Sequence, residues 1–296
     1  MNFIAFLVGL GFERLFASRG PRGQGSLLAY VRAVLGSAGA RPALVLGVAI
    51  LAVLLPAALV TLVLGLPPVV AHPALRVLIA ALVLFFALGP RDLDADIGAY
   101  RAALAHGDAA AAARLAEEIL EHDAGQRQGP TLNTVAEAVF VQANNRLFGV
   151  LFWFALAGPA GALVFRLTDL VRREAIARAR PADAPSAAAE RRRLCQSLHG
   201  VLAFVPARLL ALSYGVAGSF EESFTGWRGY LKDESDHFFD ANDHLLLFAG
   251  KGALGARWEG AAGEGERAAA ARGLVRAAFY VWLAVFALLT AAAWIS

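Results

Sequence analysis

Long apolar runs along this chain are separated by segments rich in arginine or acidic residues. Ala43–Leu66, Val69–Leu88 and Leu274–Ile295 are each long enough to cross a hydrocarbon core of ~30 Å as a helix. Met1–Phe12 is a further apolar run, which we interpret as an uncleaved membrane helix that continues to about Phe16, because no basic n-region and no convincing small-residue cleavage site accompany it. Strong strand alternation is absent, so the pattern predicts an all-α polytopic helical membrane protein with about four full spans.

Two other apolar stretches contain residues that interrupt helices. Leu147–Phe165 holds Gly158–Gly161, and the segments on both sides of it are basic enough to favour the cytoplasm. Two half-helices that turn at the glycines and return to the same side satisfy both flanks. Val201–Phe220 holds Pro206 and Arg208, and we predict a second broken or re-entrant segment there, with Arg208 pointing into the bundle.

The polar segments between the spans are predicted to be cytoplasmic, and most are helical. Ile97–His106 and Ala109–Leu120 are amphipathic, and Gly107-Asp108 between them indicates a helical hairpin. Pro181–Ala189 is by composition a flexible linker. The basic loops that we place in the cytoplasm contain Arg14, Arg19, Arg22, Arg32 and Arg41, then Arg166, Arg172, Arg173, Arg178, Arg180, Arg191, Arg192 and Arg193.

These boundaries divide the chain into five segments. They are the N-terminal membrane helices (1–89), a cytoplasmic helical hairpin with the polar central helix (90–146), the broken membrane segments with a basic linker (147–220), a cytoplasmic polar region (221–273) and the C-terminal membrane helix (274–296).

Composition agrees with a membrane protein and narrows its chemistry. Of the 296 residues, 58% are hydrophobic and 17% charged, and the mean hydropathy is +0.57. The net charge of +3 comes almost wholly from arginine, and we expect a lipid bilayer but no nucleic acid as partner. Cys195 is the single cysteine, which excludes an intrachain disulfide and a cysteine metal cluster.

The central helix carries a polar stripe that leads directly into an apolar segment. At 100° per residue Asn133, Glu137 and Asn144 fall within roughly 40° of one another, with Thr134 and Asn145 beside them. A carboxylate and two carboxamides at the membrane boundary are costly to desolvate unless they meet partners or a polar ligand. The stripe is therefore either a ligand site or a set of hydrogen bonds between packed helices.

Asp236, Asp240 and His244 form the densest group of metal-capable side chains. They stack at i, i+4 and i+8 in a helix, a donor set suited to Mg²⁺, Mn²⁺ or Zn²⁺. The spacing matches no strict metalloenzyme signature, so we favour a solvated acidic helix and expect neither a tightly bound metal nor a cofactor. Gly250-Lys251-Gly252 lacks the Ser or Thr and the glycine spacing of a nucleotide-binding loop.

Several short motifs together resemble the AmpE/CobD family. They are Arg91-Asp92-Leu93, Gly107-Asp108, Ala113-Arg114, Glu137–Phe148, Gly161-Ala162, Pro206–Leu209 and Gly252–Gly255. The resemblance implies a multi-pass protein of the bacterial inner membrane. Its AmpE-type members are linked to β-lactamase induction and cell-wall recycling, whereas its CobD/CbiB members make adenosylcobinamide phosphate, an ATP-dependent amide formation.

The chain departs from the synthase branch of this family at several acids. In the synthase motif Glu-Ser-Val-Ala-Glu-Asn-Thr-Ser-Asp only the first acid is kept, as Glu137, and the others fall on Val141 and Asn145. Its Asn-Thr-Leu-Asp motif falls on Asp169 onward and is not reproduced. Because an ATP-dependent ligase needs carboxylates to hold Mg²⁺, these losses argue against that chemistry.

The residues and the resemblance together favour a non-enzymatic membrane regulator or sensor. We expect it to bind a small polar or amphipathic ligand, such as a cell-wall fragment, in a cytoplasm-facing pocket. The alternatives are a ligase-like enzyme and a structural membrane partner that contacts another protein through residues 97–120. We expect Arg91, Arg208 and Asn242 to converge on Glu137. The candidate ligand-binding residues are Arg91, Asn133, Glu137, Asn144, Asn145, Arg208 and Asn242.

Overall fold

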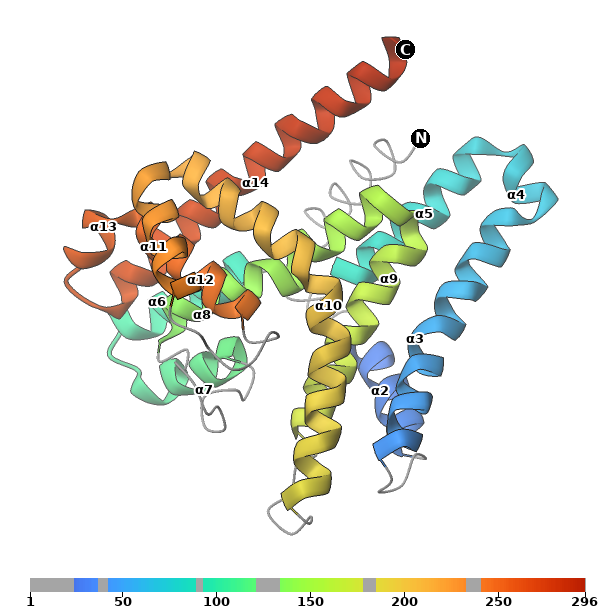
Figure 1. Ribbon diagram of the computed structural model, residues 1–296, viewed down its shortest axis with the longest axis horizontal. Coiled ribbons are helices and arrows are strands. Elements are labelled where there is room, and N and C mark those ends of the chain that lie inside the picture. Colours follow the sequence, from blue (N-terminus) through green and yellow to red (C-terminus); the bar gives the residue numbers. More distant parts are fainter. Residues whose placement is uncertain are drawn as a thin grey trace. The chain divides into compact units, whose positions relative to one another are not determined.

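Helices account for all the regular structure in the described part of the chain, as the apolar pattern predicts (Figure 1). The computed structural model describes residues 24–36, 42–88, 93–120, 134–177, 185–232 and 241–295. Contacts divide the chain into unit 1 (residues 1–91 and 145–202) and unit 2 (residues 92–144 and 203–296). The predicted first span lies outside the described residues, as do Arg91, Asn133, Asp236 and Asp240.

Unit 1 is built around α9 (Gly149–Ala177), which packs against α2 (Gln24–Gly36), α3 (Pro42–Gly65) and α5 (Pro73–Leu88). The helix α2 corrects our prediction of a short basic loop in this region, because its apolar side enters the core. The buried core of this unit includes Val31, Leu35, Val45, Ala49, Val53, Leu163, Leu167, Leu170, Val171 and Cys195.

The two predicted spans that follow the basic segment are present with one difference. The helix α3 matches the first span closely, but the second is divided into α4 (Pro67–Ala71) and α5. The break falls at His72, which is extended at φ −117° and ψ 91°. Pro73 explains it, because a proline ring disfavours helical conformation in the residue before it.

Pro56 lies inside α3 without breaking it. A proline at this position leaves the Ala52 carbonyl oxygen without its helical donor. The Tyr30 hydroxyl on α2 donates a hydrogen bond to that oxygen at 3.2 Å. Burial raises the pKa of Tyr30, which keeps the hydroxyl protonated as a donor. A neighbouring helix thus compensates for the proline inside α3.

The predicted reversal in Leu147–Phe165 is also present, and its pivot is Gly158. This residue has φ 68°, so α9 consists of two half-helices joined at a kink. A side chain at Gly161 would come within 2.5 Å of the Trp153 carbonyl oxygen, although residues so far apart in sequence lie about 12 Å apart along a straight helix. A side chain at Gly149 would likewise overlap the Phe165 ring. The half-helices are therefore antiparallel, and the chain returns in the direction from which it came.

The helix α10 (Pro185–Ala217) differs from prediction in two places. It remains helical through Pro206, where we expected a break. The Leu202 carbonyl oxygen, which Pro206 leaves without a helical donor, accepts a hydrogen bond from Trp153 Nε1 at 3.0 Å. The helix also begins inside the predicted linker, because Pro185 at the first position and the alanines after it favour helix formation.

Unit 2 contains a helical hairpin, one end of the central helix and the C-terminal helices. Its helices, besides the end of α10, are α6 (Leu93–Ala105), α7 (Ala109–Leu120), α8 (Val135–Ala143), α11 (Phe220–Lys232), α12 (Ala241–Leu254), α13 (Ala256–Glu259) and α14 (Glu264–Ile295). The predicted hairpin of α6 and α7 is confirmed: Gly107 has φ 71°, and Asp108 Oδ1 accepts from the Ala111 N–H at 2.9 Å.

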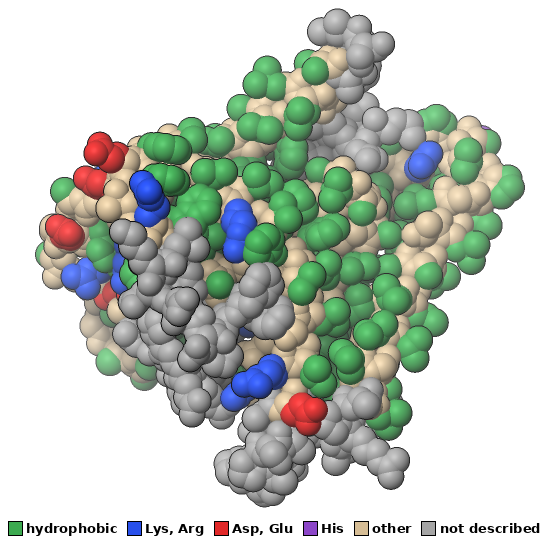
Figure 2. All heavy atoms as spheres, viewed as in Figure 1, with side chains coloured by type: hydrophobic (Ala, Val, Ile, Leu, Met, Phe, Trp, Pro, Cys, Tyr) green, Lys and Arg blue, Asp and Glu red, His purple; other side chains and the backbone are tan. Residues whose placement is uncertain are grey.

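Five helical stretches are long and apolar enough to cross a membrane. They are Leu44–Gly65, Val135–Ile176, Arg192–Ala217, Glu264–Ala292 and Pro73–Ala105, the last of which includes residues 89–92 outside the described part of the chain. Hydrophobic side chains cover the outward side of α3 (Figure 2), where Leu51, Leu55 and Leu62 are each more than 60% exposed. Leucines so exposed along one helix are typical of a lipid-facing surface. The chain is a multi-pass helical membrane protein.

Candidate functional site

The Glu137 carboxylate forms an ion pair with Lys251 of α12, within unit 2. Glu137 lies in the first turn of α8, whose N-terminal residue Thr134 accepts a hydrogen bond from the Glu137 N–H at 3.3 Å. Glu264 of α14 accepts from the Ala136 N–H at 2.8 Å. Thr134 and Glu264 thus accept hydrogen bonds from the N–H groups of Glu137 and Ala136 at the helix start. The Glu137 side chain pairs with Lys251 instead of capping the helix.

Lys251 is the more accessible partner of this pair. Its side chain is 32% exposed, against 10% for Glu137. The Lys251 ammonium lies 5.4 Å from the centre of the Trp258 ring, and the Arg267 guanidinium lies 5.9 Å from the same ring. Two cations beside one indole provide positive charge next to a flat apolar surface. The sequence does not predict Lys251 as a site residue, because Gly250-Lys251-Gly252 lacks the features of a nucleotide-binding loop and shows no other local motif.

Arg208 and Asn242, both predicted site residues, are in contact in unit 2. Arg208 donates to Asn242 Oδ1 at 2.9 Å and to the Phe204 carbonyl oxygen at 2.8 Å. Its guanidinium carbon lies 3.3 Å from the centre of the Phe204 ring. Asn242 is buried in α12, the helix that also carries Lys251. The structure therefore joins Arg208 to Asn242, and it pairs Glu137 with Lys251.

The polar stripe is divided between the two units by a π-helical segment, η2 (Asn144–Phe148). Glu137 and Asn144 belong to unit 2 and Asn145 to unit 1. Asn145 Oδ1 lies 3.2 Å from His199 Nε2, and His199 Nδ1 lies 3.4 Å from the Thr168 hydroxyl. Asn145 thus serves a buried polar chain that links α9 to α10.

A second charged cluster in unit 1 was not predicted as a site. Asp169 is fully buried and pairs with Arg166 at 3.0 Å, Arg172 at 3.1 Å and Arg173 at 2.8 Å. These are i,i+3 and i,i+4 neighbours along two turns of α9, so the spacing could have revealed the cluster. We had counted the arginines only as topology signals.

This cluster carries more positive than negative charge. Nearby, Arg32 of α2 pairs with the buried Glu174 at 3.0 Å. The four arginines and two carboxylates leave two positive charges in excess, which favours the approach of anions to this end of unit 1.

Among the described residues, no group of three or more histidine, cysteine or acidic side chains is placed to hold a metal ion. His244 is buried in α12, while its proposed partners Asp236 and Asp240 lie outside the described residues, as do Arg91 and Asn133. The predictions for those four positions remain predictions.

Comparison with known proteins identifies the family of this chain. A family described as "Regulatory signalling modulator protein AmpE" matches residues 1–292. The chain belongs to the AmpE family. No solved structure matches it.

Two curated relatives are each named "Cobalamin biosynthesis protein CobD". The one from Chromobacterium violaceum is 29% identical over 196 residues, covering 64% of this chain and 58% of the relative. The one from Stutzerimonas stutzeri is 29% identical over 191 residues, covering 64% of this chain and 60% of the relative. The match therefore spans less than two thirds of each relative's length.

Proposed function

We propose that this AmpE family member is a regulator or sensor of the inner membrane, with its ligand site in unit 2 at Lys251 and Glu137. The ligand is a small polar or amphipathic anion such as a cell-wall fragment, and the output is β-lactamase induction. The ion pair between the buried Glu137 and the accessible Lys251 carries this proposal.

The pair is suited to switching. An ion pair this deeply placed gains little net stability over an apolar pair, since the desolvation of both charges offsets their attraction. A ligand carboxylate or phosphate can approach the exposed ammonium of Lys251 and compete with Glu137 for it. Trp258 beside Lys251 offers an apolar face to the rest of the ligand. Ligand binding would then release Glu137 and loosen the contact between α8 and α12.

Substitutions at Glu137 separate ligand binding from helix packing. We expect Glu137→Gln to abolish induction while membrane abundance stays normal, because the side chain keeps its size and hydrogen-bonding capacity. If the pair only packs helices, Glu137→Leu should leave both quantities unchanged, and normal induction in that variant would end the proposal. The matched control is the exchange Glu137→Lys with Lys251→Glu, which restores a pair of opposite charges but should not restore ligand recognition.

The relatives named for cobalamin biosynthesis favour one alternative, the ATP-dependent amide formation that the resemblance to the CobD/CbiB branch implies. Two observations weigh against it. The synthase motif Asn-Thr-Leu-Asp falls at Asp169 onward, and the Asp169 carboxylate already forms ion pairs with three arginines. Val141, where the synthase has an acid, is buried in α8. The direct test incubates the purified protein with ATP, a corrinoid acid and aminopropanol phosphate. Amide product that disappears in Glu137→Gln would replace the sensor proposal with the enzyme.

A further inference from the structure

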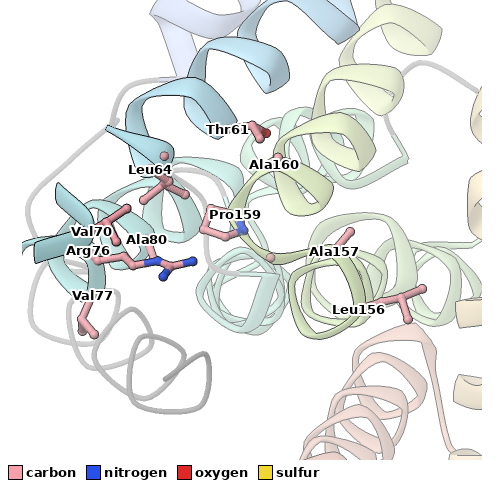
Figure 3. A pocket seen from close by; sticks show the side chains of 12 residues that line it. Thr61, Leu64, Val70, Arg76, Val77, Ala80, Leu156, Ala157, Pro159 and Ala160 are labelled. Atoms are coloured by element: carbon pink, nitrogen blue, oxygen red, sulfur yellow. The ribbon is translucent and has the colours of Figure 1, made fainter. Parts of the chain in front are cut away.

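A cavity of about 580 Å³ lies in unit 1, beside the kink of α9 (Figure 3). The end of α3, the short helix α4, the start of α5 and the tip of α9 enclose it. Most of its wall is aliphatic: Leu64, Val70, Val77, Ala80, Leu156 and Ala157.

Arg76 is the charged residue of this lining, and Figure 3 shows its guanidinium extending toward the kink of α9. It lies in the first turn of α5, inside an apolar run that is long enough to span the membrane. No acidic partner for its side chain is found within the residues that the structure describes. Arg76 is exposed at the start of this apolar helix, where a lipid phosphate can serve as the counter-charge of its guanidinium.

The kink adds to the positive character of the same cavity. The second half of α9 begins after Gly158, and Pro159 and Ala160 of its first turn line the cavity. The first N–H groups of a helix have no acceptors within that helix, and the helix dipole places partial positive charge there. Arg76 and this helix start therefore face a common space.

The cavity is also continuous with the lipid-facing surface. Val70 and Leu156 both line it, and both are exposed, at 52% and 67% respectively. A hydrated ion gains nothing from such walls, whereas an acyl chain does. We propose that the cavity holds the phosphate group of a membrane phospholipid against Arg76, with an acyl chain running over Val70 and Leu156. This lipid site is independent of the ligand site proposed at Lys251 and Glu137.

Native mass spectrometry of the detergent-purified protein tests the assignment. The protein is offered equal amounts of a phosphatidylglycerol and of a diacylglycerol with the same acyl chains. We expect phosphatidylglycerol to be retained about tenfold over diacylglycerol, as one charge-assisted contact provides. In Arg76→Gln that preference should disappear. Arg193→Gln, at an exposed arginine outside the cavity, is the matched control and should keep it.

Two further variants keep the test decisive if Arg76→Gln folds poorly. Arg76→Lys retains the charge and should retain phosphatidylglycerol, whereas Val77→Phe fills the cavity and should lower retention of both lipids. Equal retention of the two lipids by the unmodified protein would overturn the proposal, as would equal losses in Arg76→Gln and Arg193→Gln. Displacement of phosphatidylglycerol by excess inorganic phosphate would identify a soluble anion as the occupant and also overturn the lipid assignment.

Discussion

At the scale of single residues, two prolines in apolar helices show how this chain satisfies backbone groups without water. Pro56 frees the Ala52 carbonyl, and Tyr30 donates to it; Pro206 frees the Leu202 carbonyl, and Trp153 donates to it. In both cases the donor is an aromatic side chain on another helix. A carbonyl left unsatisfied in hydrocarbon is expensive, so each aromatic donor allows its proline to remain inside a helix.

Removing one of these donors should therefore destabilise the fold. We expect Tyr30→Phe to lower the free energy of unfolding by roughly 1–3 kcal/mol, because the Ala52 carbonyl loses its partner while the ring is kept. Trp153→Phe should lower it further, since it also leaves part of a buried volume empty. Denaturant unfolding in detergent measures both. The control Tyr280→Phe changes an exposed tyrosine of α14. Equal stability of Tyr30→Phe and Tyr280→Phe would refute the role given to the hydroxyl.

Asp169 is the second residue with a prediction of its own. Asp169→Asn leaves the buried Arg166 and Arg172 and the half-buried Arg173 without their carboxylate, and breaking a buried ion pair in this way costs about 3–5 kcal/mol. We expect the variant to be nearly absent from the membrane fraction. Glu174→Gln is the control, because the Arg32 side chain that pairs with it is 58% exposed and can be solvated. Normal abundance of Asp169→Asn would show that the arginines do not depend on this carboxylate.

At the scale of elements, the reversal of α9 decides how the chain enters and leaves the bilayer. Gly158 allows it, because φ 68° is strained for residues with a Cβ atom. Gly149 and Gly161 permit the close packing of the two half-helices. A straight helix through this region would instead cross the membrane once.

Cross-linking distinguishes the reversed helix from a straight one. In a Cys195→Ser background, Gly149→Cys with Phe165→Cys should form a disulfide on mild oxidation, because the two positions face each other. Along a straight helix they would lie about 24 Å apart. The control pair is Gly149→Cys with Ala175→Cys. Ala175 lies in the second half-helix, beyond Phe165 and away from Gly149, so this pair should not cross-link. Failure of the first pair, with both thiols reactive, would contradict the reversal.

The sequence predicted those elements that depend on local chemistry. The α6–α7 hairpin follows from Gly107-Asp108, and the α9 reversal follows from Gly158 between two basic flanks. The continuity of α10 could not be predicted, because it rests on Trp153, far away in sequence. The same holds for the site: Glu137 was identified from its stripe, whereas its partner Lys251 comes from α12 and no local pattern connects the two.

At the scale of the whole molecule, the distribution of arginine and the reversal of α9 together predict the membrane topology. Residues 121–133 precede the reversed segment and residues 178–184 follow it. If the chain turns back at Gly158, we predict that both stretches lie on one side of the membrane. The arginines from Arg166 to Arg193 predict that this side is the cytoplasm. The uncharged turn at Pro67-Pro68 should then lie on the opposite, periplasmic side.

Thiol labelling in intact cells tests this arrangement with three single-cysteine variants that lack Cys195. An impermeant reagent added from the periplasm should label His72→Cys, which lies beside the uncharged turn. It should label Gln126→Cys and Ser186→Cys only after permeabilisation, because the arginine-rich segments resist transfer across the bilayer. Labelling of position 186 but not 126 from the periplasm would restore a single crossing. In that case the half-helices of α9 would have to separate in the membrane, although Gly149 and Gly161 pack them together.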